Sequence, residues 1–499
     1  MFFKNKKNGS ILFVSLVMTG VFMLMVTGTI SMGLLQQKIN MIKVANAQAI
    51  YIAEAGINYY RWVLYHDKNE FCNKETCIDA PNYGPYGPYP YSDQSGNILG
   101  HYELYITPPS LDTNSIITIK SVGWVDKYPN IKRTIEVKCG ITSWSSFAVL
   151  SNSDVRFGEG TEIWGPIYSN GGIRFDGIAH NIISSAVLDY KDPDHEGENE
   201  FGVHTHVFPV DPYPDGNNPP QNLPNRTDVF MGGRSFPDPV ISFDLLDNYI
   251  NDTLETAEDG GLILDSSGVE GYHITFLPNE LMRIRKVNSV TSPCSVCIET
   301  GCTRWNKQGK CIQTGCTEYN TTPTYGINNE SNYMDNISIP SNGIIFVKDN
   351  VWVDGKIKNN RVTILAFKEP LSGNNTDIII NDDLLYTNYD GQDVIGLIAQ
   401  RNITVGFYSK NNLEIDAAMI AKNGRVGRDY YYSACGSQAN KNILTLKGSM
   451  ATKERYGFAY TDNSGYQIRN IIFDNNLQSV PPPHFPTTGE YTFISWEEK

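Results

Sequence analysis

A short acidic stretch followed by two histidines holds the side chains best suited to bind a cation. Asp192, Asp194 and Glu196 fall at alternate positions of the segment DPDHEGENE, and His204 and His206 follow closely. Calcium loops use alternating oxygen donors beside a glycine turn, which this segment partly offers. The sequence predicts a solvated acidic loop and no cofactor. Calcium, bound by the three carboxylates, is the alternative.

Acid–base chemistry would need clustered carboxylates with an arginine or histidine beside them. The residues of that kind are Asp382, Asp383 and Asp416, with Arg401 and Arg425 on neighbouring segments. Their spacing matches no acid–base signature, and no Gly-rich phosphate loop or HExxH motif accompanies them. Solvated turn carboxylates explain the same residues. We expect no catalytic residues and a chain that is not an enzyme.

Cysteines are the third set of reactive side chains. The chain has nine, an odd number, so at least one thiol is free or shared with another chain. Disulfides form outside the cytosol. Zinc is the alternative, built on Cys294-x2-Cys297 with the cysteines that follow. Six cysteines are disulfide candidates of open connectivity, in three groups with four residues between the members: Cys72 and Cys77, Cys297 and Cys302, Cys311 and Cys316.

The segments that must position these groups are short β runs with Gly and Asn at their corners. SNSDVRFGE, residues 151–159, matches SNGGIRFDG, residues 169–177, at a spacing of 18. Later, Ile398-Ala399, Ile420-Ala421 and Met450-Ala451 occupy equivalent settings. Short repeats of β runs favour a solenoid. We predict a right-handed parallel β-helix over residues 141–499, with a β-sandwich as the alternative.

The predicted solenoid carries two insertions. One, residues 236–260, holds a helix from Phe243 to Ala257, and the other is a Cys-rich loop, residues 289–325. We expect Phe485, Phe493 and Trp496 to cover the last open coil. The following pairs are expected to point inward and stack from coil to coil: Val155 and Phe157, Ile173 and Phe175, Ile344 and Phe346, Val351 and Val353, Ile378 and Ile380.

The amino-terminal region predicts one long helix. Residues 8–37 carry no charge, and Ile11 to Leu35 would span about 37 Å as a helix, enough for the roughly 30 Å hydrocarbon core of a bilayer. Helical periodicity continues without proline, so we expect a transmembrane and amphipathic helix over residues 10–66. Basic residues before the apolar stretch place the amino terminus in the cytoplasm.

A small α+β head is expected over residues 67–140. Its strands are predicted at Tyr102–Ile106, Ile116–Val125 and Lys132–Val137, and YGPYGPYPY, residues 83–91, is predicted to be a loop. The fold class is therefore α+β and then all-β. It comprises a long helix with a small antiparallel sheet, followed by the parallel β-helix with its insertions.

Three interpretations of the amino terminus remain open. It could be a secretory signal peptide ending near Ala45-Asn46-Ala47, although its apolar region is about twice the usual length. It could be an ordinary single-pass anchor. In the third interpretation residues 1–9 form a basic leader of the prepilin type, which ends in Gly9 and is cleaved before Ser10.

The segment KNKKNGSILFVSLVMTG, followed by ANAQAIYIAEAGINYYRW, resembles the amino-terminal region of PilX-type minor pilins of type IV pili. The most specific match is Ala53-Glu54-Ala55-Gly56. The resemblance implies cleavage between Gly9 and Ser10 and a helix that associates with other pilins. Major pilins carry glutamate at the fifth position after cleavage, where this chain has Val14, so the resemblance points to a minor subunit. The carboxyl-terminal region resembles that of large PilX-like surface proteins.

The net charge of −14 disfavours nucleic acid as a partner. We expect a non-enzymatic minor pilin-like subunit of a type IV pilus or pseudopilus that serves pilus assembly or adhesion. Its partners would be membrane lipid before assembly, other pilins or pseudopilins through the helix, and a surface or glycan ligand. It would cross the cytoplasmic membrane once, with its carboxyl-terminal domain outside and on the cell surface or pilus after assembly. The alternatives are a permanently anchored surface adhesin or scaffold and a β-helix carbohydrate-active enzyme.

Overall fold

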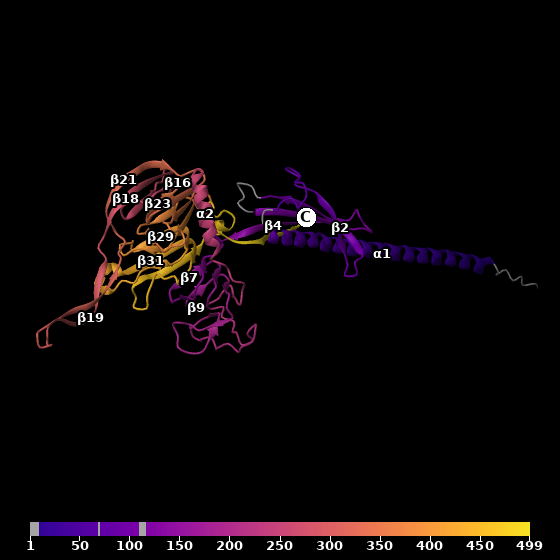
Figure 1. Cartoon of the computed structure of the whole chain (residues 1–499). Helices are drawn as coiled ribbons and strands as arrows, with labels where there is room; N and C mark the ends of the chain where they lie inside the picture. Colours follow the sequence, from indigo (N-terminus) through magenta and orange to yellow (C-terminus); the bar gives the residue numbers. More distant parts are fainter. Residues whose placement is uncertain (1–8, 68–69, 109–115) are drawn as a thin grey trace, which may run out of the picture. The chain divides into compact units, whose positions relative to one another are not determined.

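The computed structural model describes residues 9–67, 70–108 and 116–499 (Figure 1). The chain forms two compact units. The first, here called the helical unit, comprises Met1–Ile141 together with Glu490–Lys499. The second, the β-rich unit, comprises Thr142–Gly489. Because the chain leaves the helical unit once and returns to it, the β-rich unit is an insertion in the helical unit.

The helical unit begins with a single helix, α1, Gly9–His66. Residues 11–44 are all exposed, whereas the second half of α1 has one buried face. That face carries Ala45, Ala49, Ile52, Ala53, Ile57, Tyr60, Val63 and Leu64. These residues recur every three or four positions, as one face of a helix requires. The predicted long amino-terminal helix is confirmed.

A five-stranded sheet in the order β1-β2-β3-β4-β33 covers this face. The strands are β1 (Tyr86–Ser92), β2 (Ile98–Thr107), β3 (Ile116–Val125), β4 (Lys132–Ser143) and β33 (Thr487–Glu498). β1 to β4 pair antiparallel in chain order. The predicted loop over residues 83–91 is wrong for most of its length, because β1 lies there. An edge strand tolerates Pro88 and Pro90, since one of its sides needs no N–H donors.

The carboxyl-terminal strand also differs from the prediction. β33 lies beside β4 in the sheet of the helical unit, so Trp496 belongs to that unit, where it is exposed, and the side chain of Phe493 lies outside the described residues. Phe485 does lie in the core of the β-rich unit. Instead, the last repeat is covered by the first, because Met450 and Ala451 of β31 pair in parallel with Val149 and Leu150 of β5.

The β-rich unit is dominated by one 21-stranded sheet in which most neighbours are parallel. The expected large sheet-rich domain is thus confirmed. Smaller sheets are formed by β14-β9-β6, by β12-β13 and by β19-β20. In chain order, the first strands of the whole unit are β5 (Val149–Ser151), β6 (Val155–Phe157), β7 (Thr161–Trp164), β8 (Ile167–Ser169), β9 (Ile173–Phe175), β10 (Ile178–Ala179), β11 (Ile183–Ser185), β12 (Asp189–Tyr190), β13 (Glu200–Phe201), β14 (Val203–His204) and β15 (Arg234–Ser235). The next are β16 (Leu262–Leu264), β17 (Gly271–Phe276), β18 (Leu281–Val290), β19 (Cys294–Trp305), β20 (Cys311–Thr322) and β21 (Ile327–Ser338). The last are β22 (Ile344–Val347), β23 (Val351–Ile357), β24 (Arg361–Ala366), β25 (Ile378–Ile380), β26 (Leu384–Tyr386), β27 (Val394–Ala399), β28 (Ile403–Val405), β29 (Asn412–Ala421), β30 (Val426–Arg428), β31 (Asn440–Thr452) and β32 (Gly465–Phe473).

The 18-residue repeat is a parallel pair in register. Val155 lies opposite Ile173 and Phe157 opposite Phe175. At the corner before these strands, Asn170 Nδ2 donates to Asn152 Oδ1 at 2.8 Å. All ten residues predicted to point inward are buried, at 3% exposure or less. The alternation of apolar and polar residues identified the core positions of β6 and β9, whereas residues 344–346, 351–353 and 378–380 are apolar and buried at every position.

The second repeat is partly out of register with the prediction. Ile398 pairs with Ile420 as expected, but Ile420 pairs with Ala451 and Met419 with Met450, a slip of one residue. Ala417 to Ala421 are all buried, on both faces of β29. A strand buried on both faces lacks the alternation that fixes register in a sequence.

Both predicted insertions contain regular structure. Helix α2, Leu245–Glu258, buries Leu246, Ile250 and Ala257 in the core of the unit. The Cys-rich segment is not a loop, because β19 and β20 form an antiparallel hairpin. Four 3-10 helices complete the described structure: η1 (Trp144–Ser146), η2 (Ser433–Cys435), η3 (Ser437–Ala439) and η4 (Asn475–Gln478).

Candidate functional site

The exposed half of α1 is the most distinctive surface of the helical unit. It is the one helix, among the described residues, that is long and apolar enough to cross a membrane. Four of its hydroxyl groups donate to backbone carbonyls within the helix, those of Ser15, Thr19, Thr27 and Thr29. Such back-bonding lets hydroxyl side chains lie in an apolar environment without an unpaired donor. The segment is therefore suited to lipid or to the apolar surface of another helix.

The Ala53-Glu54-Ala55-Gly56 signature lies where α1 meets the sheet. Ala53 and Gly56 are buried, Ala55 is half-buried and Glu54 is exposed. A Cβ atom built on Gly56 would lie 2.4 Å from Ser121 Oγ and 2.7 Å from Tyr102 Cδ2. The small residues thus allow close approach of helix and sheet, and Glu54 contributes no buried charge.

The predicted cleavage junction lies at the start of the described chain. α1 begins at Gly9 and contains Ser10, whereas residues 1–8 of the leader lie outside the described residues. Cleavage between Gly9 and Ser10 stays a prediction.

The three carboxylates that are the candidate calcium ligands have different environments. Asp194 pairs with Arg455 and lies 3.9 Å from Arg156, and Glu196 is exposed. Asp192 is 3% exposed and lies beside His204 and Arg174. Among the described residues, the groups with metal-ligand spacing include Asp192 but neither of the other two carboxylates. These groups also contain His195 and Glu200, which lie in the same acidic stretch but were not among the predicted ligands.

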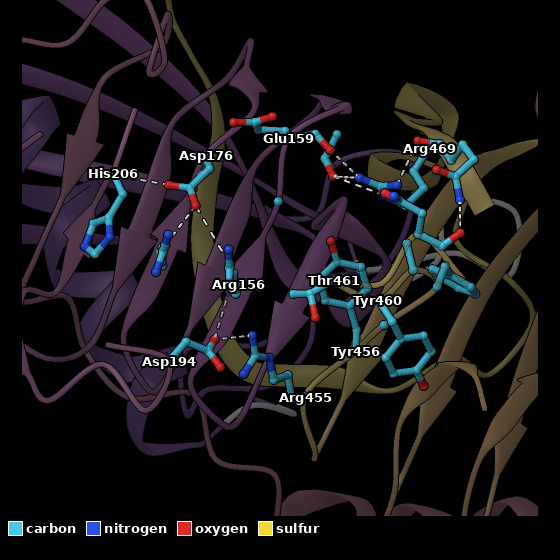
Figure 2. A pocket seen from close by; sticks show the side chains of 18 of the residues that line it. Arg156, Glu159, Asp176, Asp194, His206, Arg455, Tyr456, Tyr460, Thr461 and Arg469 are labelled. Atoms are coloured by element: carbon cyan, nitrogen blue, oxygen red, sulfur yellow. Dashed lines mark hydrogen bonds and ion pairs between the residues drawn. The ribbon is translucent and has the colours of Figure 1, made fainter. Parts of the chain in front are cut away.

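A cleft of about 680 Å³ opens beside these residues (Figure 2). Asp176, Arg156, Asp194 and Arg455 form a chain of ion pairs along one wall. Tyr456, Tyr460, Thr461 and Arg469 lie across from them in Figure 2. Five arginines line the cleft: Arg156, Arg174, Arg425, Arg455 and Arg469. Guanidinium groups beside aromatic rings suit an anionic or polyhydroxylated ligand.

His206 lies at the same cleft and joins it to the histidine cluster. Its backbone N–H donates to Asp176 Oδ1 at 2.9 Å, which fixes the start of the segment after β14. Burial, helped by the positive charge of Arg174, lowers the pKa of the His206 imidazole to about 4. The ring is therefore neutral at physiological pH, so one of its two nitrogens can accept.

The residues considered for acid–base chemistry each have their own partner. Asp382 and Asp383 pair with Lys410, Arg401 pairs with Asp377, and Arg425 pairs with Asp429. Asp416 is fully buried on β29, where its Oδ2 atom accepts from Tyr389 Oη at 2.8 Å and from the Tyr386 N–H at 2.9 Å. Burial raises the pKa of Asp416 to about 6. Each of these side chains is thus held by a neighbour in the fold, as structural residues are.

Eight cysteines form disulfides, so the expected disulfides are confirmed as a class. Cys72 pairs with Cys77, whereas the other four candidates pair across the β19–β20 hairpin, as Cys297–Cys316 and Cys302–Cys311. Cys294 pairs with Cys435, and neither is among the six predicted candidates. These bonds leave no thiolate for the zinc alternative. Cys139 is the free cysteine, and burial raises the pKa of its thiol to about 12.

No protein-family model and no curated protein matches the chain. Among solved structures, the chain is similar to the competence-associated pilin ComZ from Thermus thermophilus. The two share 13% sequence identity, and the alignment covers 91% of this chain and 97% of that one, with a TM-score of 0.30. A TM-score this low does not establish a common fold, so the function proposed below rests on α1 and the sheet that covers it.

Proposed function

We propose that the chain is a non-enzymatic, minor pilin-like subunit of a type IV pilus or pseudopilus. One observation carries the proposal: residues 11–44 of α1 are exposed along their whole length, while the following half of the same helix packs on an antiparallel sheet. The first half therefore needs an apolar environment from outside the chain. Lipid supplies it before assembly, and the helices of neighbouring subunits supply it in a fibre.

The physical drive for this exchange is apolar burial. Each square ångström of apolar surface removed from water contributes about 25 cal/mol. Side chains such as Phe13, Leu24 and Leu34 are each more than 60% exposed. Once the helix leaves the membrane, only another apolar surface restores that stabilisation, so neighbouring helices are the favoured partners. Val14, at the place of the glutamate of major pilins, agrees with a subunit of low copy number.

In this proposal α1 anchors the β-rich unit, which is the domain that the subunit displays. We interpret its parallel ladder, in which β22, β24, β27, β29, β31, β5 and β8 pair in turn, as a β-helix. It would be displayed outside the cytoplasmic membrane, with the amino terminus in the cytoplasm, and would act in adhesion or pilus assembly. The arginine- and tyrosine-lined cleft is the surface that we assign to a surface or glycan ligand.

Mass measurement of the membrane-bound protein tests the anchor. The proposal expects a mature chain that begins at Ser10 and is also present in sheared fibres. A Gly9→Val variant should retain residues 1–9 and stay in the membrane fraction, whereas Gly20→Val, with no heavy atom within 4 Å of its Cβ position, should be processed normally. A chain that keeps residues 1–9 would favour the permanently anchored adhesin or scaffold. A mature start near Gln48 would indicate a secreted protein and contradict the proposal.

Site-specific photo-crosslinking tests the partner. A crosslinker at exposed Phe22 should capture other pilin subunits in fibres, whereas the same group at Ala53, buried against the sheet, should react within the chain. Crosslinks from Phe22 to lipid alone, in cells that assemble fibres, would contradict assembly. Release of reducing sugar from a glycan panel would contradict the non-enzymatic assignment.

A further inference from the structure

Three histidines and two carboxylates converge beside the cleft of the β-rich unit. Asp192 and His195 belong to the segment between β12 and β13, Glu200 lies on β13, and His204 and His206 lie on and just after β14. Two triplets have ligand atoms within 4.8 Å of one another, namely Asp192, His204 and His206, and His195, Glu200 and His206. His206 belongs to both triplets, so the five side chains form one cluster.

Three of the five residues are buried, and six polar atoms of the cluster lack a hydrogen-bond partner in the described structure. His204 is 0% exposed, Glu200 2% and Asp192 3%. Both ring nitrogens of His204, together with Asp192 Oδ2, His195 Nδ1, Glu200 Oε2 and His206 Nε2, lack a hydrogen-bond partner in the described structure. A buried polar group without a partner costs about 1–3 kcal/mol. Imidazole nitrogens and carboxylate oxygens gathered at one point are the donor atoms that a metal cation takes.

Glu200 gives the clearest evidence of missing positive charge. Among the described residues, only the rings of His195 and His206 come within ion-pair distance of it, at 3.7 Å and 3.6 Å. A buried carboxylate without a compensating cation is strongly disfavoured. A divalent ion between the two rings and the carboxylate would provide that charge.

The surrounding contacts hold the donor atoms in place, as outer contacts do in metal sites. The backbone N–H of Asp194 donates to Asp192 Oδ1 at 2.9 Å, which leaves Oδ2 directed at the cluster. Thr205, between the two histidines, donates its N–H to Asp211 Oδ2 at 3.1 Å. Arg174 lies 3.5 Å from Asp192 Oδ2 and offsets part of its charge, so we regard Glu200 as the principal carboxylate.

We propose that this cluster binds one divalent transition-metal ion of the zinc class. The ligands are His195 Nδ1, His206 Nε2 and Glu200, with His204 and Asp192 beside them. Metal–nitrogen and metal–oxygen bonds of about 2.0–2.1 Å at tetrahedral angles separate neighbouring ligand atoms by about 3.4 Å. Glu200 Oε1 lies 3.7 Å from His195 Nδ1 and 3.6 Å from His206 Nε2, close to that value. Imidazole donors suit zinc-class ions, whereas calcium takes oxygen ligands.

The ion would join the β12–β13 segment to the end of β14, and His206 brings it to the wall of the cleft (Figure 2). Asp194, in that same segment, pairs with Arg455 on the cleft wall. Metal binding would therefore fix one side of the cleft in place.

Metal analysis of the full-length protein in detergent tests the proposal. After treatment with chelator and dialysis against zinc, the wild type should retain about one equivalent of zinc and its melting temperature should rise. The same protein loaded with cobalt(II) should show the visible absorption of a tetrahedral site. Calcium should produce neither retention nor a shift.

Matched variants locate the site. His206→Gln should lose zinc retention and the cobalt spectrum, and His195→Gln should weaken both, its side chain being the most exposed of the five. His180→Gln is the control, because His180 hydrogen-bonds Glu162 outside the cluster. If the chelated wild type takes up no zinc or cobalt, or if His206→Gln and His195→Gln keep the wild-type spectrum, the proposal is overturned. Circular dichroism of each apo variant shows whether a loss of metal reflects misfolding.

Discussion

Gly123 of β3 lies directly against the backbone of Ala53 in α1. A Cβ atom built on Gly123 would come within 2.4 Å of Ala53 N and 2.6 Å of Ala49 O. Two alanines of the helix and one glycine of the strand thus bring the two backbones together with no side chain between them. The small residues of the pilin-like signature act in packing, and they fix how α1 sits on its sheet.

Gly123→Ala should therefore separate α1 from the sheet. The added methyl group meets backbone atoms, which cannot turn aside, so we expect a loss of about 1–3 kcal/mol in the free energy of unfolding of the helical unit. Amide hydrogen exchange over residues 45–64 would report it as reduced protection. Gly28→Ala, with no heavy atom within 4 Å of its Cβ position, is the control. Equal protection in both variants would refute the close approach.

The loss of a disulfide should lower the stability of the β-rich unit more when the bond closes a longer loop. Cys294–Cys435 closes a separation of 141 residues, and Cys302–Cys311 a separation of 9. On chain-entropy grounds these contribute about 5 and about 2.6 kcal/mol. The paired change Cys294→Ser, Cys435→Ser should lower the melting temperature of the β-rich unit. Cys302→Ser, Cys311→Ser should only increase proteolysis within the β19–β20 hairpin, because that bond constrains the hairpin alone. A lower melting temperature from the second variant but not the first would contradict this assignment.

Stability should depend on pH through Asp416. Burial raises its folded-state pKa from 3.8 to about 6, although the Tyr386 N–H and the Tyr389 hydroxyl oppose that change. The folded state thus binds the proton more tightly than the unfolded state, so stability falls as the pH rises from about 3.8 to about 6 and stays lower above it. Asp416→Asn, which cannot ionise, should be more stable than wild type by roughly 1–3 kcal/mol at pH 7.5.

The same comparison made near pH 3.5 should show little difference between Asp416→Asn and wild type, because both side chains are then neutral. Asp382→Asn is the control, since Asp382 is exposed and paired with Lys410. Denaturant titration across this pH range measures all three proteins. An Asp416→Asn variant that loses stability at pH 7.5 would show that the carboxylate is ionised and stabilising.

Much of the architecture follows from local patterns. The length of α1, the inward rows such as Val155 and Phe157, and the 18-residue register were predictable because apolar spacing specifies them directly. The slip between Ile420 and Ala451 was not, because β29 is apolar on both faces. Proline and glycine in residues 83–91 indicated a loop, but an edge position allowed a strand there.

Only part of the candidate metal cluster could be predicted from the sequence. Asp192, His204 and His206 were visible as a group in the sequence, but the sequence could not show which neighbours would be buried with them. Glu200 was one of several acidic residues until its pairing opposite Tyr190 placed it inside. Likewise, Cys435 has no sequence spacing that identifies Cys294 as its partner, because the pairing depends on how the hairpin is placed on the β-rich unit.

Strand β33 completes the sheet of the helical unit at the edge formed by β4. Its end is held to β4 by an ion pair between Glu498 and Arg133, by Lys499 Nζ at 2.6 Å from Glu136 Oε1, and by the Lys499 N–H, which donates to Thr134 O at 3.0 Å. Deleting residues 490–499 would leave β4 as an unpaired edge, and an exposed edge strand promotes pairing with other chains.

We therefore expect the truncated protein to self-associate and to lose hydrogen-exchange protection in β4, while the β-rich unit keeps its melting temperature. The double change Glu498→Gln, Lys499→Gln is the matched control. It removes the exposed charges but keeps the backbone pairing, and exposed ion pairs contribute at most about 1 kcal/mol each. Light scattering and hydrogen exchange distinguish the outcomes. A monomeric truncated protein with a protected β4 would show that β33 is dispensable for the sheet of the helical unit.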